Sequence, residues 1–331
     1  MSNLTLRAVT RPAAVAFTLL VGIVFVAVLT LTLGQLGVPL AHLFTPDDTE
    51  KIVLGTLRGP RLSVAILAGA AFGVAGTLFQ TVTKNPLGSP DVIGLSAGAA
   101  AGAAAFGLMW TGIMPLPVGA LVGAIVAMVL VFAGTGRGFS SPSRMLLVGI
   151  GVSAMAGAFV QFAVLRAGRE QATVLTAYLS GSLASRSWDQ VVIIAGCLAV
   201  LLPAALALSR RLHVLALGDE ASDALGSPSG TTRILAVLVG IGLATGAVSV
   251  VGPVAFIALT APQIALRMAR VPGPAIGLSA LTGSALLVVA DLLSQQSPLP
   301  VQLPVGILTA ALGGIYLGFL LISQFRQGTL S

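Results

Sequence analysis

The chain has 331 residues, of which 56% are hydrophobic and 8% are charged, and its mean hydropathy is +1.03. About a quarter of the residues in soluble globular proteins are charged, so this composition excludes a soluble domain and predicts an integral membrane protein. The net charge of +7 is not accompanied by a basic stripe with interleaved aromatic residues, so it does not indicate a nucleic-acid partner.

Ten apolar stretches predict the membrane spans. A bilayer core of about 30 Å is crossed by roughly 20 apolar residues in a helix that rises about 1.5 Å per residue. Stretches of about that length lie at residues 13–33, 62–82, 93–110, 116–133, 145–165, 191–208, 234–251, 254–270, 276–294 and 304–322. We therefore predict an all-α, polytopic membrane protein with about ten transmembrane helices in one domain, residues 1–331. The first stretch is too long for a signal peptide and lacks a clear cleavage site, so it is expected to be an uncleaved span.

One uncharged stretch, residues 234–266, is too long for a single span. As one helix it would extend about 50 Å. Gly252-Pro253 is the predicted break, because proline cannot continue the hydrogen bonding of a helix. The part after the break is the shortest of the ten stretches, so a partly broken helix is expected there as readily as a complete span.

The distribution of Lys and Arg predicts the orientation. An even number of spans puts both termini on one side, and cytoplasmic loops carry an excess of Lys and Arg. The terminal side has eleven such residues and the other side six; the first group is Arg7, Arg11, Lys84, Arg137, Arg144, Arg210, Arg211, Arg233, Arg267, Arg270 and Arg326, and the second is Lys51, Arg58, Arg61, Arg166, Arg169 and Arg186. Both termini are therefore expected in the cytoplasm.

A search for catalytic, metal-binding or nucleotide-binding residues gives little. His42 and His213 are both expected in loops without ligand-spaced partners, which argues against a metal site. The glycine-rich segment at 134–141, GTGRGFSS, lacks the lysine of a phosphate-binding loop. Cys197 is the one cysteine, so no intrachain disulfide forms. We expect no cofactor, no ATP site and no enzymatic activity in this chain.

Two features inside the spans have structural interpretations. Asp291 lies in the apolar run LLVVADLL, where a charge costs about 3 kcal/mol. It could belong to a proton or ion relay, but a structural acid bonded to nearby backbone or hydroxyl groups is favoured, because a relay needs several titratable groups. Gly69, Gly73 and Gly76 give the second span a small face, which favours close helix packing within one bundle over a dedicated dimer face.

Three loop segments carry more information than the spans. LALGDEASDALG, residues 215–226, is an acidic, helix-prone segment on the predicted cytoplasmic side. RGPR, residues 58–61, precedes the second span on the outer side, where its arginines could reach lipid headgroups or pair with carboxylates of a partner. KNPLGSPD, residues 84–91, contains two prolines and a glycine and therefore cannot form a continuous helix.

With these segments the chain resembles the FecCD-type permeases of binding-protein-dependent ABC importers for iron-siderophore complexes, haem and cobalamin. The resemblance covers about residues 50 to 325 and rests on RGPRLSVAILAGAAFGVAGTLFQ, KNPLGSPDVIGLSAGA, LALGDEASDALG, GPVAFIALTAPQIALR and LPVGILTAALGGIYLGFLL in this order. The wording is most similar to permeases of the ferric-enterobactin type. The resemblance implies a fold like that of the cobalamin permease, a ferric siderophore as the substrate, and a location in the inner membrane of a bacterium.

The resemblance also implies an assembly. Two permease subunits, here expected to be paralogues, would enclose the pathway. Two copies of an ATP-binding subunit would lie below them and a substrate-binding protein above. Arg58 and Arg61 match the arginines that dock the binding protein. The segment that couples to the ATPase would comprise Leu217, Gly218, Asp219, Glu220, Ala221, Leu225 and Gly226. Asn85 and Leu87 match a cytoplasmic gate, and Ser143 falls in a turn that supplies a second gate.

Three positions depart from the family pattern. Gln295 stands where the cobalamin permease has a third docking arginine, and Pro142 beside Ser143 puts the second gate in doubt. Gln263 replaces a common histidine, so a structural role is expected there. The alternatives are a haem or cobalamin permease, an ion-coupled secondary transporter, which usually has several intramembrane charges, and a membrane-embedded enzyme, for which no catalytic pair is visible.

Overall fold

The computed structural model describes residues 2–34, 36–136, 142–168, 175–176, 178–297 and 303–326. Ten helices in this part of the chain fall on the ten predicted spans: α1 (Ser2–Thr32), α3 (Gly59–Thr83), α4 (Leu95–Ala104), α5 (Leu116–Gly134), α6 (Pro142–Arg166), α8 (Trp188–Ala216), α10 (Ser229–Val251), α11 (Ile257–Ala269), α12 (Ile276–Gln295) and α13 (Val305–Arg326). Shorter elements connect them: η1 (Leu40–His42), α2 (Asp48–Ile52), η2 (Val53–Arg58), η3 (Pro90–Ile93), η4 (Ala105–Met109) and α9 (Asp219–Ala224). The all-α prediction is confirmed.

The predicted break at Gly252-Pro253 is present. Helix α10 ends at Val251, and Gly252 follows with φ 84°, a conformation that glycine adopts without strain. The chain re-enters a helix at Ile257, and α11 has 13 residues, which at about 1.5 Å per residue reach only about 20 Å. The sequence allowed either a complete span or a partly broken helix after Gly252-Pro253. The structure has the partly broken helix, because α11 is too short to cross a bilayer.

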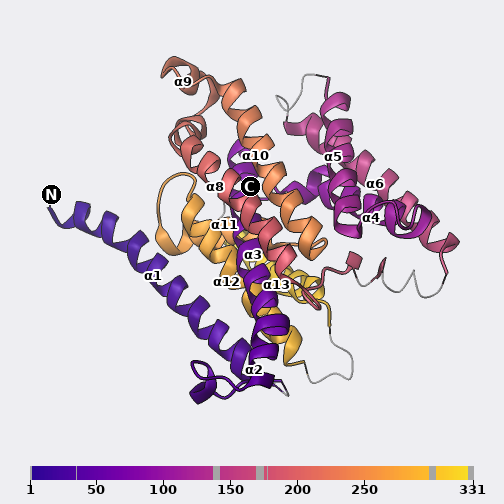
Figure 1. Cartoon of the computed structure of the whole chain (residues 1–331). Coiled ribbons are helices and arrows are strands. Elements are labelled where there is room, and N and C mark those ends of the chain that lie inside the picture. The colour runs from indigo at the N-terminus through magenta and orange to yellow at the C-terminus, as the bar shows by residue number, and fades with distance from the viewer. Residues whose placement is uncertain are drawn as a thin grey trace.

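Helices α3 and α10 form the centre of the bundle (Figure 1). In their most apolar stretches 72% and 78% of the residues are buried, against 11% in α1, which lies obliquely at the edge. The small face of α3 explains this position. Gly69 and Gly73 lie against the backbone of α12 at Gly283 and Ser279, and Gly76 lies against Ala258 of α11. The glycines therefore serve packing within one bundle, as predicted.

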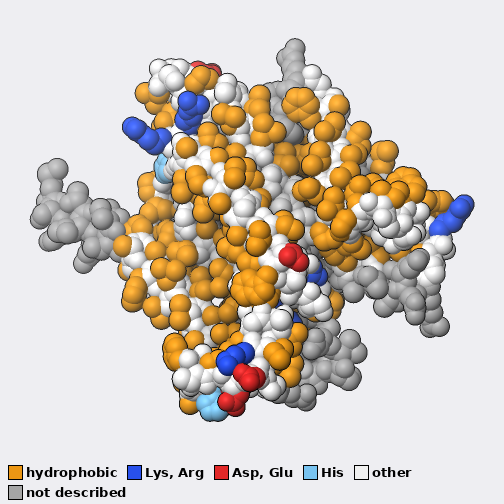
Figure 2. Space-filling view, viewed as in Figure 1, with side chains coloured by type: hydrophobic (Ala, Val, Ile, Leu, Met, Phe, Trp, Pro, Cys, Tyr) orange, Lys and Arg blue, Asp and Glu red, His pale blue; other side chains and the backbone are white. Residues whose placement is uncertain are grey.

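The bundle has two polar ends, which we name the α9 end and the α2 end after the short helices found there (Figure 1). Hydrophobic side chains dominate the face shown in Figure 2. Charged side chains gather near these two helices, and a few others lie in the middle and at the far right of the view. Arg11 donates a hydrogen bond to the carbonyl of Met268 at the last turn of α11. The Arg267 guanidinium lies 6.0 Å from the ring centre of Tyr316 in α13. The first and last helices thus both reach the α9 end.

Both predictions about the histidines need correction. His213 lies in the last turn of α8 and not in a loop, because this helix continues past the predicted span to Ala216. His42 does have partners: its Nδ1 lies 2.9 Å from Glu50 Oε1, and Asp47 is close enough that the three side chains could hold a metal ion. All three have another structural role, since Asp47 and Glu50 form the capping box of α2 and His42 pairs with Glu50.

Candidate functional site

The loop that follows α3 is a tight turn held by its own side chains. Lys84 caps the helix in a left-handed conformation, with φ 50°, and its N–H donates to the carbonyls of Gln80 and Thr81. The side-chain oxygen of Asn85 accepts from the N–H of Leu87 at 2.9 Å, and the carbonyl of Asn85 accepts from Gly88 at 2.9 Å. Asn85 and Leu87, two of the three predicted gate residues, therefore belong to one hydrogen-bonded turn at the α9 end.

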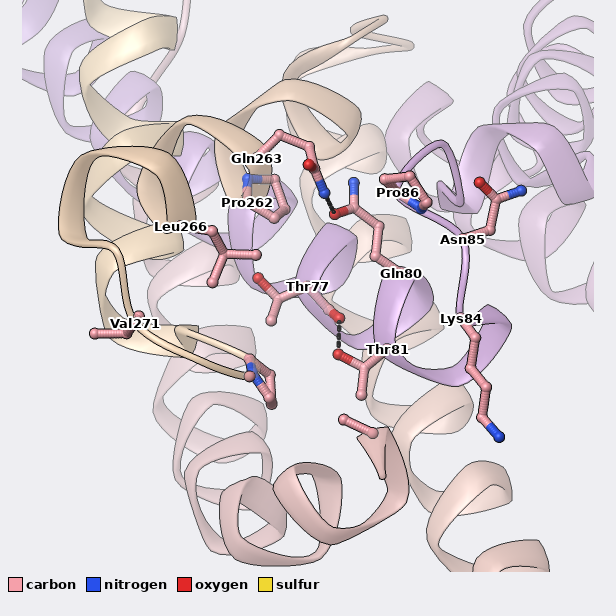
Figure 3. A pocket seen from close by; sticks show the side chains of 13 residues that line it. Thr77, Gln80, Thr81, Lys84, Asn85, Pro86, Pro262, Gln263, Leu266 and Val271 are labelled. Carbon is pink, nitrogen blue, oxygen red and sulfur yellow. Dashed lines mark hydrogen bonds between the residues drawn. The ribbon is translucent and has the colours of Figure 1, made fainter. Parts of the chain in front are cut away.

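A pocket of about 360 Å³ opens beside this turn, between the end of α3, α11 and the segment 271–274. Figure 3 shows Gln80 of α3 and Gln263 of α11 pointing toward each other in its wall. Gln263 Nε2 donates to Gln80 Oε1 at 2.7 Å, and Gln80 Nε2 donates to the carbonyl of Leu259 at 2.9 Å. The two amides join α11 to α3, which gives Gln263 a structural contact at the position where the family often has histidine.

Helix α9 projects from the α9 end and is closed at both edges by glycine. Gly218 has φ 127° and Gly226 has φ 74°, so a Cβ at either position would be strained. Ser222 is buried, and its hydroxyl donates to the carbonyl of Ser227 at 2.6 Å. Leu217 and Leu225 are instead 71% and 66% exposed. Leu217 and Leu225 flank α9 on either side. Two exposed leucines beside a short helix at the polar end of a membrane protein are suited to contact a soluble partner.

Asp219, the first residue of α9, forms two ion pairs. Lys84 Nζ lies 2.8 Å from its Oδ1, and Arg233 Nη2, from the first turns of α10, lies 3.0 Å from both carboxylate oxygens. The hydrogen bond from Lys84 is the largest cause that lowers the pKa of Asp219, and Arg233 adds to it. The carboxylate therefore stays ionised and joins α9 to both α3 and α10.

At the α2 end, the two predicted docking arginines contact groups within this subunit. Arg58 is 8% exposed, and its guanidinium donates to the carbonyls of Thr30 and Leu33 at the end of α1. Such carbonyls have no partner within their own helix, so Arg58 caps α1. The structure therefore gives Arg58 a contact within this subunit, and the docking role that the resemblance implies stays a prediction.

Arg61 is paired with Asp291 of α12. Its Nε and Nη2 lie 2.9 and 2.7 Å from Asp291 Oδ1, and Gln295 Nε2 donates to the other oxygen at 2.7 Å. The prediction that Asp291 would be bonded to backbone or hydroxyl groups is wrong, because its partners are a guanidinium and an amide side chain. Gln295, at the position that matches a third docking arginine of the cobalamin permease, here donates to the same carboxylate.

The sequence predicted most of these site residues, but it did not predict two of the residues that they contact. Ser143 lies in the first turn of α6, and its side chain is outside the described part of the chain. Arg233 and Gln80 were not predicted as site residues. Arg233 stands 14 positions after Asp219 and Gln80 stands 183 positions before Gln263, so no short motif connects either pair.

A helical bundle with apolar flanks and a short polar helix at one end defines a polytopic membrane protein. The chain belongs to the FecCD transport family, whose model matches residues 19–323. It is accordingly a permease subunit of an ABC importer and not itself an enzyme, and this class of permease works with ATPase and binding-protein partners.

Curated relatives agree with this membership, and a solved structure has the same fold. The chain is 40% identical over 277 residues to the ferric enterobactin permease FepG of Escherichia coli K12, covering 83% of this chain and 84% of that protein. It is 33% identical to the Fe(3+)-citrate permease YfmE of Bacillus subtilis 168, covering 98% and 99% of the two chains. A metal-chelate type ABC transporter in an inward-facing conformation has the same fold, with a TM-score of 0.83, 24% identity and coverage of 94% and 99%.

Proposed function

We propose that this chain forms, with a second permease subunit that is a paralogue, the membrane pathway of an importer for a ferric siderophore. The match to the FecCD family over nearly the whole chain carries this proposal. Relatives named for ferric enterobactin, ferric citrate and achromobactin transport have different ligands, and the first two share ferric iron held by a chelator. A ferric chelate is therefore the substrate class that this membership supports.

The α9 end is proposed to face the cytoplasm of a bacterium, with both termini on that side of the inner membrane. This end holds the larger share of Lys and Arg, as the positive-inside rule requires: Arg11, Lys84, Arg210, Arg211, Arg233, Arg267 and Arg270 are described there. The exposed Leu217 and Leu225, which flank α9, would then meet one of two ATPase subunits. Arg58 and Arg61 would meet the substrate-binding protein on the outer side.

The proposed cycle moves the substrate without chemical change. The binding protein delivers the ferric siderophore to the outer mouth, and ATP binding and hydrolysis in the separate ATPase displace the coupling segment. The gate turn with Asn85 and Leu87 opens or closes in response, with Ser143 as a second gate residue. In this scheme the permease has two states, and docking at one end and nucleotide at the other each bias the equilibrium between them.

The substrate is tested by uptake in a strain that lacks this gene. Loss of growth on one ferric siderophore under iron limitation, with growth on ferrous iron retained, supports the proposal. Loss of haem or cobalamin use while every siderophore is still used would assign the chain to those substrates instead.

The coupling segment is tested with Leu217→Asp combined with Leu225→Asp. Both side chains are largely exposed, so the permease should fold, while ATPase copurification and uptake should be lost. Asp219→Lys combined with Glu220→Lys is expected to have the same effect. Normal uptake in both double variants would remove the coupling role from α9.

A further inference from the structure

Lys84 is the residue through which the gate turn contacts α9. It directly precedes Asn85, and its backbone N–H is bonded to the last turn of α3. Its side chain extends away from the turn (Figure 3), and Nζ lies 2.8 Å from Asp219 Oδ1. Because the backbone of the turn is held by the hydrogen bonds of Asn85 and Gly88, a force on Lys84 acts on the whole turn.

The two cations that share Asp219 differ in their surroundings. The Arg233 side chain is 8% exposed and contacts both carboxylate oxygens, whereas the Lys84 side chain is 43% exposed and contacts one. Arg233 therefore fixes α9 to the start of α10. The Lys84 pair is the more accessible of the two contacts and joins α9 to a different helix, α3.

We propose that Lys84 is a positioning residue that transmits displacement of α9 to the gate turn at 84–88. The inference rests on the proposed function, since it requires α9 to be moved by an ATPase and the turn to act as a gate. When α9 moves with Asp219, the ion pair draws Lys84 and the attached turn with it. Without this pair the ATPase can still bind and hydrolyse ATP, but the turn no longer follows.

The weakness of an exposed ion pair makes this inference testable. Such pairs contribute little to folding stability, so removal of the Lys84 charge should leave the permease folded. The chain has two lysines, Lys84 and Lys51. Lys51 pairs with Asp48 at the opposite end of the bundle, where its side chain is 61% exposed. Lys51→Met is therefore a matched control for Lys84→Met.

The first measurement is transport per ATP hydrolysed by the complete importer in proteoliposomes, with radioactive ferric enterobactin as the probe. Lys84→Met should lower this ratio at least about fivefold, the lower end of typical coupling between sites. Lys84→Arg should restore most of it, and Lys51→Met should not change it. Asp219→Asn combined with Lys84→Met should be no worse than Asp219→Asn alone. An unchanged ratio in Lys84→Met, or additive losses in the double variant, would overturn the proposal.

The second measurement does not depend on the substrate. Amide hydrogen exchange is followed in the importer with and without a non-hydrolysable ATP analogue. In the wild type, nucleotide should change exchange in both α9 and residues 84–88; in Lys84→Met the change in α9 should persist while that in the turn is lost. An equal response of the turn in both proteins overturns the Lys84 link even when ferric enterobactin is not the substrate. If nucleotide does not change amide exchange in α9 of the wild type, that result contradicts the proposed function.

Discussion

Arg61 of α3 and Asp291 of α12 form a two-pronged ion pair between residues 230 positions apart, with side chains 16% and 1% exposed. A carboxylate in an apolar bundle is costly unless it is paired and hydrogen-bonded. Asp291 meets both conditions, because Gln295 binds its second oxygen. The pair joins the two helices at the α2 end and makes Arg61 part of the fold as well as a candidate docking residue.

Removal of Arg61 alone should therefore be severe. Arg61→Ala leaves the Asp291 carboxylate buried without its cation, and breaking a buried pair in this way costs about 3–5 kcal/mol. We expect a large fall in the thermal stability of the permease in detergent. A docking role alone would predict only a mild loss of uptake in Arg61→Ala and no change in its stability.

The matched control replaces both members of the pair. In Arg61→Leu with Asp291→Leu neither charge of the pair remains, and apolar replacement of a buried pair is often neutral or stabilising. The double variant should be markedly more stable than Arg61→Ala. Equal stability of the two would show that the ion pair does not account for the effect of Arg61.

Arg58 should have a measurable but small role in docking. Arg58→Met removes a charge that is buried against the end of α1. Even a fully exposed ion pair with the binding protein would contribute only about 0–1 kcal/mol. The affinity of the reconstituted importer for its binding protein should fall by no more than about fivefold, and its salt dependence should decrease. Arg58→Glu combined with Arg61→Glu should abolish uptake, but here through lost folding as well as repulsion. Unchanged affinity and salt dependence in Arg58→Met would limit Arg58 to capping α1.

Close packing of α3 predicts a large cost for a single methyl group at Gly76. A Cβ there would overlap the Ala258 carbonyl of α11, whereas a Cβ at Gly22 in α1 meets no atom within 4 Å. Overpacking of a well-packed interior typically costs about 1–3 kcal/mol. Gly76→Ala should therefore lower the unfolding temperature clearly, and Gly22→Ala should leave it unchanged or raised. Tolerance of Gly76→Ala would mean that α3 and α11 can separate without loss of stability.

The segment around α2 should respond to pH through His42. The hydrogen bond to Glu50 raises the pKa of His42 above its ordinary value of 6.5. A raised folded pKa contributes stability that is fully present below the unfolded value and is lost as the pH rises through the folded one. Amide protection at residues 40–52, corrected for intrinsic exchange, should decrease as the pH rises above about 6.5. His42→Gln should abolish this dependence; a dependence that persists in the variant would assign it to another group.

The sequence by itself determined where the ten helices fall, the break at Gly252-Pro253 and the exposed character of α9, although only seven helices in the described part of the chain are long and apolar enough to cross a membrane. These depend on local properties: apolar length, the missing N–H of proline, and acids and glycines in a short polar segment. The small face of α3 was also predicted correctly, because glycines spaced three and four positions apart lie on one side of a helix. The length of α8, and with it the place of His213, was missed because a helix can continue beyond the bilayer after its apolar stretch ends.

Only the tertiary structure decided which polar side chains meet. Asp291 pairs with Arg61, which lies 230 positions away in the chain. Asp219 pairs with Lys84 across 135 positions, and Gln263 pairs with Gln80 across 183 positions. The order and rotation of the helices in the bundle set these pairs, and sequence spacing carries no information about either. A buried polar group must find a partner, so the sequence could indicate that Asp291 has one, but the packing of α3 against α12 determined that it is Arg61.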